Sequence, residues 1–448
     1  MTHPYLSLTD ADLREMLAAI GVGSMEELFG DVPAGVRLGR ELELPPPLSE
    51  PELVSRFAEL ASRNVQTGDE ISFLGAGMYD HYVPAIVDAV LARGELLTAY
   101  TPYQPELSQG MLQAIFEYQT AICELTGLDV SNASGYDGCT VAADACYVAK
   151  HATGRTGIVL CETLSPQVRA VVATYAVGFG MEVTTVPHRG GATDPDELAT
   201  AAEGAAIVIF QQPNFLGCLE PAPDLAAAAA GAGALACAHV DPLSLGVLEA
   251  PGPYGCAIAV GEGQGAGNHI SFGGPHYGFL ASSQELMRRL PGRIVGETTD
   301  VRGDRGFVLT LQTREQHIRR EKATSNITTN QTLLALAGLV YLAWLGPAGL
   351  AELGETCLAL SRHLRERLSA RAGLEPAFGH PCFKELAVRL PGSAEEAVGY
   401  ARARGVHPGY PLGRAFAEMD DVLLVAVTEK RTPDDIDRLA EALEEVLA

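Results

Sequence analysis

The chain has 448 residues, 47% of them hydrophobic, which is enough for a large packed core and argues against intrinsic disorder. Its 56 acidic residues outnumber its 31 basic residues, and the formal net charge is −25 at pH 7. This charge would repel nucleic acid and anionic membrane surfaces, so the expected partners are proteins or small metabolites.

The nine cysteines are scattered, with no Cys-x-x-Cys pair and no histidine cluster at zinc spacing. We therefore expect reduced, mostly buried thiols, no metal site and a cytoplasmic protein. The first residues have neither a basic segment nor a continuous apolar run, so no signal peptide is expected. The longest apolar stretch, residues 333–346, is shorter than the roughly 20 residues of a membrane span and is predicted to be a buried core helix.

Residues 1–70 are predicted to form an N-terminal helical arm. Apolar periodicity and cap residues place its helices at 9–20, at 24–29 and from the Ser49 cap to Arg63.

Residues 71–330 are predicted to form a large α/β domain. A helix at 83–93, a loop rich in tyrosine and proline and a long helix ending near Gly127 lead into short apolar runs that alternate with helical segments. The predicted strands are 157–162, 181–187, 205–212, 234–241, 256–263 and 277–283. Several are apolar on both faces, which indicates a mostly parallel sheet covered by helices on both sides.

Residues 331–448 are predicted to form the interdomain helices and a small C-terminal α+β domain. After a strand at 307–312, the core helix and a helix at 350–372 lead to two further strand and helix pairs. These pairs are 383–390 with 393–404, and 421–428 with 433–447.

Asp241 ends the fourth predicted strand of the sheet. An aspartate at such a place keeps the pyridine nitrogen of pyridoxal phosphate protonated, although Asp before Pro at a strand end is also a common turn. Such an enzyme needs a lysine in the following loop, VGEGQGAGNHISFGGP (260–275), where Gln264 offers an amide that cannot attack an aldehyde. Because no lysine lies between Lys150 and Lys322, the layout of such an enzyme lacks its covalent anchor.

Two glycine-rich segments allow other interpretations. The run GEGQGAG resembles a dinucleotide-binding loop, but another glycine turn follows it where that motif requires a helix. The loop NASGYDG (132–138) precedes a predicted helix, whose first amides could cradle a phosphate. A turn with Asp137 as N-cap is the favoured alternative, because that carboxylate would satisfy those amides and repel a phosphate.

Two polar segments are candidates for contacts. The loop at 100–104 suits a contact surface or a substrate pocket, or is only a loop fixed by two prolines. The run at 314–331 carries hydroxyls that could bond a phosphate or cap the next helix. The candidate residues are Tyr100, Thr101, Tyr103 and Gln104 in the first segment and Ser325, Asn326, Thr328 and Thr329 in the second.

Five motifs together resemble the P-protein family of the glycine cleavage system. They are FLGAGMYDHYVP, TAYTPYQPELSQG, NASGYDG, VGEGQ with SFGGP, and REKATSNITTNQ. The similarity extends over essentially the whole chain and is to subunit 1 of the two-subunit form. It implies the aspartate-aminotransferase fold of pyridoxal phosphate-dependent transferases (fold type I), with a mostly parallel seven-stranded sheet. It also implies that subunit 2 holds the cofactor, that Gln264 stands about where the lysine of subunit 2 stands, and that Asp241 is vestigial.

The resemblance further implies an oxidoreductase active only as a complex of two copies of each subunit. Glycine would lose carbon dioxide on the partner's pyridoxal phosphate, and the aminomethyl group would pass to the lipoyl arm of the H-protein. This chain, with no catalytic residue of its own, would complete the site. The segment at 100–104 would line the cleft, and Ser325, Asn326, Thr328 or Thr329 would reach the partner's phosphate. The alternatives are a stand-alone pyridoxal enzyme using another lysine, such as Lys322, and a purely structural partner.

Overall fold

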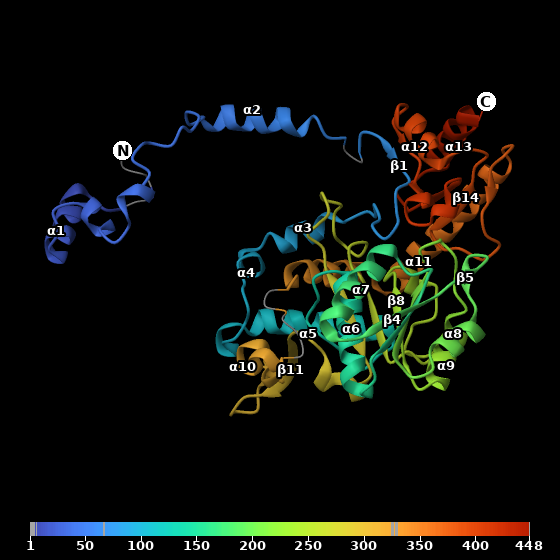
Figure 1. The fold of residues 1–448 in the computed structure, drawn as a ribbon, viewed down its shortest axis with the longest axis horizontal. Helices are drawn as coiled ribbons and strands as arrows, with labels where there is room; N and C mark the ends of the chain where they lie inside the picture. The colour runs from blue at the N-terminus through green and yellow to red at the C-terminus, as the bar shows by residue number, and fades with distance from the viewer. Residues whose placement is uncertain (1–4, 6, 66–67, 324–326, 328–329, 448) are drawn as a thin grey trace. The chain divides into compact units, whose positions relative to one another are not determined.

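The computed structural model describes residues 5, 7–65, 68–323, 327 and 330–447 (Figure 1). The chain separates into two compact units, Met1–Val65 and Gln66–Ala448. The domain boundaries expected at residues 70 and 330 stay a prediction.

The first unit contains the predicted helices of the arm. Helix α1 spans Asp10–Ile20 and helix α2 spans Glu50–Ala61, with short 3₁₀ turns at Met25–Phe29 and Ala34–Val36. Both long helices start with a capping box, and Ser49 is the N-cap of α2 as predicted. Neither helix has a buried residue.

A seven-stranded sheet forms the centre of the second unit. Its order is β2 (Val130–Ser131), β10 (Gly278–Ser282), β9 (Ile258–Glu262), β8 (Leu235–Val240), β7 (Ala205–Gln212), β3 (Gly157–Cys161) and β4 (Glu182–Val186). Strand β10 is antiparallel to both of its neighbours, and every other pairing is parallel. All six strands predicted from the apolar runs are present, and the mostly parallel sheet confirms the predicted fold class.

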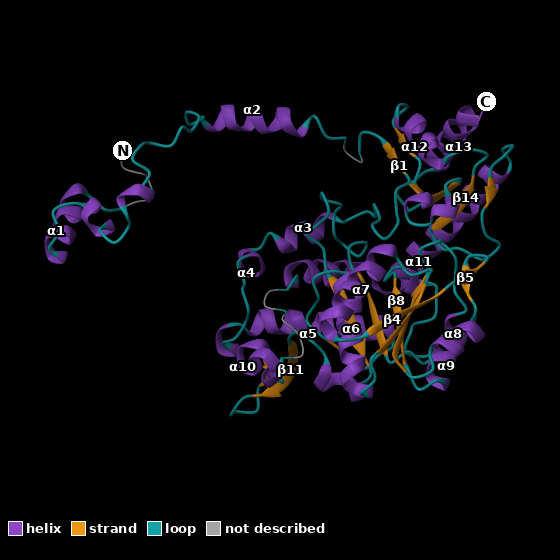
Figure 2. Ribbon diagram, in the orientation of Figure 1, coloured by secondary structure: helices purple, strands orange, loops and turns teal. Residues whose placement is uncertain are grey.

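Helices cover both faces of this sheet (Figure 2). Helices α6 (Gly138–Thr153) and α7 (Pro166–Phe179) share one core cluster with the alternate strand residues Ile158 and Ile207. Helices α5 (Gln109–Thr126), α8 (Pro195–Ala201) and α9 (Ala222–Gly231) share the other with Val159 and Val208. Successive strand residues thus enter opposite cores, as a sheet buried on both sides requires.

Helix α11, Thr332–Ser369, joins the two predicted helices of this region across a kink at Gly346, whose φ is +61°. By length and composition it could cross a membrane. However, Ala335 and Leu336 pack into the core beneath the sheet, and Tyr341 and Leu353 into an adjacent cluster. The helix is therefore part of the protein core, as predicted.

The remaining elements of the large domain lie around the sheet. They are α3 (Ala85–Leu91), α4 (Gly94–Leu97), α10 (Gln316–Arg319), the pair β5 (His188–Arg189) and β6 (Ala192–Thr193), and the hairpin β11 (Ile294–Thr299) with β12 (Arg305–Thr310). Strands β2, β5, β6 and β11 were not predicted.

The C-terminal domain is built on a four-stranded antiparallel sheet. Its order is β13 (Glu375–Pro376), β14 (Glu385–Arg389), β17 (Val422–Ala426) and β16 (Tyr410–Pro411), with α12 (Ala394–Arg402) and α13 (Pro433–Leu447). Strand β1 (Ile71–Ser72) pairs in parallel with β15 (Val406–His407). The chain thus passes the C-terminal domain before it enters the large domain, and this places residues 73–82 between the two.

Candidate functional site

A cavity lies at the carboxyl ends of the parallel strands, between the sheet and the C-terminal domain. Its walls come from the ends of β7, β8 and β9, the start of α6, residues 76–79 and residues 383–385. Open α/β sheets bind ligands at this edge. The cavity contains Asp241 in its lining, and Gln264 adjoins the lining residue Gly265.

Gln264 is buried and fully engaged in hydrogen bonds to the backbone. Its Oε1 accepts from the Tyr79 amide at 2.8 Å, and its Nε2 donates to the carbonyls of Tyr79 at 3.1 Å and Asn268 at 2.9 Å. Its own amide N–H donates to Glu262 at 3.0 Å. The glutamine therefore joins the glycine-rich loop to the segment around Tyr79 and presents no amine.

Asp241 forms the turn that was the alternative interpretation of its position, and it also forms an ion pair that the sequence did not predict. Its Oδ1 accepts from the Leu243 amide at 3.1 Å, which makes the turn after β8. Its Oδ2 lies 2.6 Å from the Nζ of Lys384, whose side chain is only 2% exposed. The carboxylate is therefore already paired with a buried cation.

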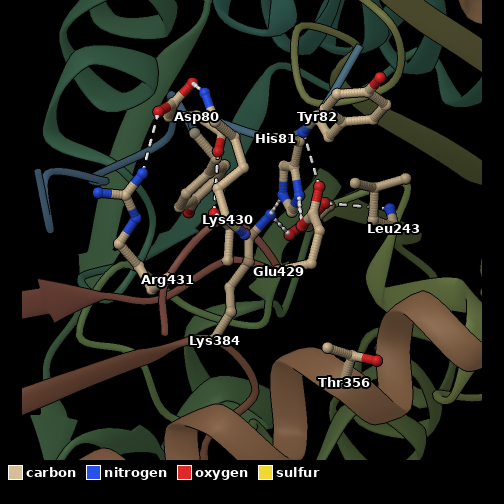
Figure 3. A network of polar contacts seen from close by, with 12 residues as sticks. Asp80, His81, Tyr82, Leu243, Thr356, Lys384, Glu429, Lys430 and Arg431 are labelled. Carbon is tan, nitrogen blue, oxygen red and sulfur yellow. Dashed lines mark hydrogen bonds and ion pairs between the residues drawn. The ribbon is translucent and has the colours of Figure 1, made fainter. Parts of the chain in front are cut away.

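The Lys384 ammonium has three neighbours of suitable polarity. Besides Asp241, the His81 Nε2 lies 2.9 Å from Nζ, and the Tyr79 ring centroid lies 3.5 Å away. Burial, together with the charge of Lys384, lowers the pKa of His81, so its imidazole is neutral. The Nδ1 of His81 then donates to the Glu429 carboxylate at 2.7 Å (Figure 3).

Glu385, next to the lysine, binds the same segment from the other side. Burial raises its pKa to about 7. Its two oxygens accept from the Ala76 amide at 2.7 Å and from the Tyr79 hydroxyl at 2.8 Å. Farther along, Asp80 pairs with Lys430 at 2.6 Å (Figure 3). Residues 76–82 are thus fastened to the C-terminal domain along their length.

The first amides of α6 bind carboxylates. The N-cap is Asp137, whose Oδ1 accepts from the Thr140 amide at 2.7 Å, which confirms the turn and N-cap interpretation of this loop. Glu262 accepts from the Gly138 amide at 2.9 Å. It also lies 2.8 Å from His276, and this hydrogen bond raises the pKa of His276.

One group of side chains in this region has the spacing of metal ligands. The ligand atoms of His81, Cys357 and Glu429 lie within 4.8 Å of one another. The Lys384 ammonium beside His81 already supplies the positive charge there.

The tyrosine loop lines a second cavity. Tyr100 and Thr101 contribute to its wall, together with Arg293 and Asn330. Tyr100 is 70% exposed, and the Tyr103 hydroxyl accepts from Arg293 Nη2 at 3.0 Å. Gln104 is exposed and does not line this cavity. The described lining of this cavity has no residue in common with the cavity at Asp241.

The four hydroxyl and amide candidates of the next segment, Ser325, Asn326, Thr328 and Thr329, lie outside the described residues. The N-cap of α11 is Gln331. Lys322, the residue suggested for a stand-alone enzyme, is exposed.

The sequence interpretation missed the residues that fill the first cavity from the C-terminal side. Lys384 and Glu385 are adjacent charged residues at the start of the run FKELAVRL, whose other residues are apolar except for the exposed Arg389. Charged residues are almost never fully buried without partners. Two neighbouring charges in a mostly apolar run therefore indicate polar partners elsewhere in the fold, and this was the signal that the sequence offered.

The chain is similar to known proteins over nearly its whole length. The family model "Glycine cleavage system P-protein" matches residues 3–443. A protein of Moorella thermoacetica named "Probable glycine dehydrogenase (decarboxylating) subunit 1" is 50% identical over 445 residues, covering 99% of this chain and all of that protein. A protein of the same name from Carboxydothermus hydrogenoformans is 48% identical, over 98% of this chain and 99% of that protein.

Solved structures agree with the sequence comparisons. A crystal structure of glycine decarboxylase (P-protein) of the glycine cleavage system, in inhibitor-bound form, superposes with a TM-score of 0.92 at 46% identity, covering 99% of this chain and all of that one. A cysteine desulfurase from Thermococcus onnurineus, 14% identical with a TM-score of 0.62 over 85% of this chain and 95% of that one, shares the fold alone. The chain belongs to the glycine cleavage system P-protein family.

Proposed function

We propose that this chain is the cofactor-free half of a two-subunit glycine decarboxylase. With subunit 2 it would remove the carboxyl group of glycine and pass the aminomethyl group to the lipoyl arm of the H-protein. The observation that carries this is the state of the first cavity. Both ends of the Gln264 side-chain amide form hydrogen bonds with the backbone. The lysine that lines the cavity, Lys384, forms an ion pair with Asp241.

The chemistry is divided between the subunits. Pyridoxal phosphate, held by subunit 2, supplies the electron sink for the carbanion that remains when carbon dioxide leaves. A resting covalent link to that cofactor needs a free amine. Neither Gln264 nor the ion-paired Lys384 offers one at this edge of the sheet.

This chain contributes polar and aromatic surface to the site of its partner. Tyr100 is exposed, and Arg293 holds the hydroxyl of Tyr103, so this loop is ordered yet available for contact. Thr101 belongs to the same surface, and the run at 325–329 is proposed to reach the partner's phosphate. An assembly of two copies of each subunit in the cytoplasm completes the proposal.

The test is reconstitution. Carboxyl-labelled glycine, lipoylated H-protein and pyridoxal phosphate are incubated with this chain alone, with subunit 2 alone and with both, and released carbon dioxide is counted. We expect release with both subunits and background release with this chain alone. Release by this chain alone would refute the proposal and favour a stand-alone enzyme.

A purely structural role is the second candidate, because the loop residues could stabilise an interface without contacting substrate. Steady-state kinetics of assembled complexes with Tyr100→Ala or Thr101→Ala separate the two roles. Changed KM or kcat in complexes of unchanged size supports the completing role, and unchanged kinetics support the structural one.

A further inference from the structure

The P-protein family belongs to a system that depends on pyridoxal phosphate, and the cavity at Asp241 lies where enzymes of this fold would bind that cofactor. A pocket for it must satisfy a protonated ring nitrogen, an anionic phosphate and a reactive aldehyde. We propose that this cavity is closed to pyridoxal phosphate by the chain's own side chains, each standing where one of those groups would bind. The inference concerns the cavity alone and does not depend on the activity proposed for the complex.

The place of the ring nitrogen is taken by Lys384. An aspartate at the end of this strand would pair with a pyridinium cation, and here Asp241 pairs with the ammonium at 2.6 Å. The ammonium also meets His81 and the face of Tyr79, so it is held on three sides. A pyridinium brought to Asp241 would face a like charge in a buried site, which is unfavourable for both.

The place of the phosphate is taken by carboxylates. The start of a helix attracts anions because its first amides are unpaired and its dipole is positive there. In α6 the amides of Gly138 and Thr140 already donate to Glu262 and Asp137. His276 compensates part of the Glu262 charge. A phosphate would therefore find these donors occupied and two carboxylates close by.

The place of the aldehyde offers no partner and little space. Gln264 holds the Tyr79 backbone through both ends of its amide. The cavity volume is about 70 Å³, which is room for a few water molecules.

The same contacts hold the C-terminal domain over the cavity. Phe383, Lys384 and Glu385 form its wall from that domain, and Glu385 also binds Ala76 and Tyr79. Entry of the cofactor would require these bonds to break together with the ion pair. Restoring an amine at position 264 should therefore not restore binding.

The experiment compares the full-length wild-type chain with Gln264→Lys and with the triple variant Gln264→Lys, Lys384→Met, Glu262→Gln. Each is incubated with pyridoxal phosphate and then with borohydride. A lysine amine condenses with the aldehyde and releases water, and borohydride delivers hydride to the carbon–nitrogen double bond to leave a stable secondary amine. Peptide mass spectrometry measures the adduct at residue 264, with exposed Lys322 as the background in the same digest.

We expect Gln264→Lys to label at residue 264 no more than Lys322 does, and the triple variant to label at least tenfold more than Gln264→Lys. Labelling of Gln264→Lys at the level of the triple variant would overturn the inference, and so would a folded triple variant with no gain. Circular dichroism checks folding. A second measurement needs no variant: in the wild-type chain, acetic anhydride should modify Lys384 at least tenfold more slowly than Lys322, and equal rates would overturn the inference.

Discussion

The ion pair between Lys384 and Asp241 is where a conservative substitution should have a large effect on stability. The two side chains are 2% and 12% exposed, and their charged atoms lie 2.6 Å apart. Asp241→Asn keeps the side-chain shape and leaves the ammonium facing the neutral His81 nitrogen and the Tyr79 ring. Because removing one partner of a buried ion pair costs about 3–5 kcal/mol, we expect the free energy of unfolding to fall by about that amount.

A substitution of the other partner, Lys384→Met, and the double variant together measure the coupling energy between the two charges. Lys384→Met should cost less, about 2–3 kcal/mol, because Asp241 keeps some solvent contact and the Leu243 amide still donates to it. In the double variant no buried charge is left unpaired. Its loss of stability should therefore be smaller than the sum of the single losses by about 2 kcal/mol or more.

Urea unfolding of the full-length variants, followed by circular dichroism and by fluorescence of Trp344, provides the free energies. The exposed pair Arg189 and Glu197, with side chains 67% and 37% exposed, serves as a matched control. Its cycle should give a coupling below about 1 kcal/mol. If the stability loss of the double variant equals the sum of the two single losses to within about 0.5 kcal/mol, the two charges are independent and the reasoning is wrong.

Three other predictions concern pH, packing and activity. Burial raises the pKa of Glu385 from 4.5 to about 7, so the folded chain keeps a proton that the unfolded chain releases between those values, and folding weakens as pH rises through that window. Glu385→Gln should remove about 1–3 kcal/mol of the difference in unfolding free energy between pH 4.5 and 7.5, and an unchanged difference would contradict this. A Cβ at Gly338 would lie 2.1 Å from the Tyr277 hydroxyl, so Gly338→Ala should lower stability in urea by about 1–3 kcal/mol, whereas Gly399→Ala, in an open part of helix α12, should raise it by about 0.5–1 kcal/mol. Tyr100→Ala should leave stability within about 0.5 kcal/mol and lower turnover of the assembled complex, and unchanged turnover would reject a role for this tyrosine.

Most of the fold was predictable because its signals are local. Several strands of the central sheet are short runs that are apolar on both faces. Helices throughout the chain carry cap residues, such as Ser49 before α2 and Gly127 after α5, the latter with φ of +66°. Strand β11 was missed because its second half, Glu297–Thr299, is polar and exposed. The two-residue pairing of β1 with β15 was missed because it joins segments from opposite ends of the second unit and has no local pattern.

Some residues of the candidate site could be predicted from the order of the strands, and others could not. Asp241 and Gln264 were found because they follow neighbouring strands of one sheet, where chain order predicts proximity. Lys384 comes from the other domain, and its partner His81 is 303 residues away in sequence. Their meeting depends on how the C-terminal domain packs on the sheet, which no periodicity in the sequence encodes.

The ion pair of Lys384 with Asp241 also explains how the chain keeps a largely buried carboxylate at this edge of the sheet. An empty cavity would leave Asp241 as an unpaired carboxylate in a largely buried position, which is costly. The Lys384 ammonium removes this cost, so we expect a residue without an amine at position 264 and a cation at position 384 to occur together. A subunit that binds the cofactor cannot keep both, since its ring nitrogen and the ammonium would compete for one carboxylate. We therefore expect subunit 2 to have a lysine at the position of Gln264 and an uncharged residue at the position of Lys384, and a basic residue there would contradict the argument.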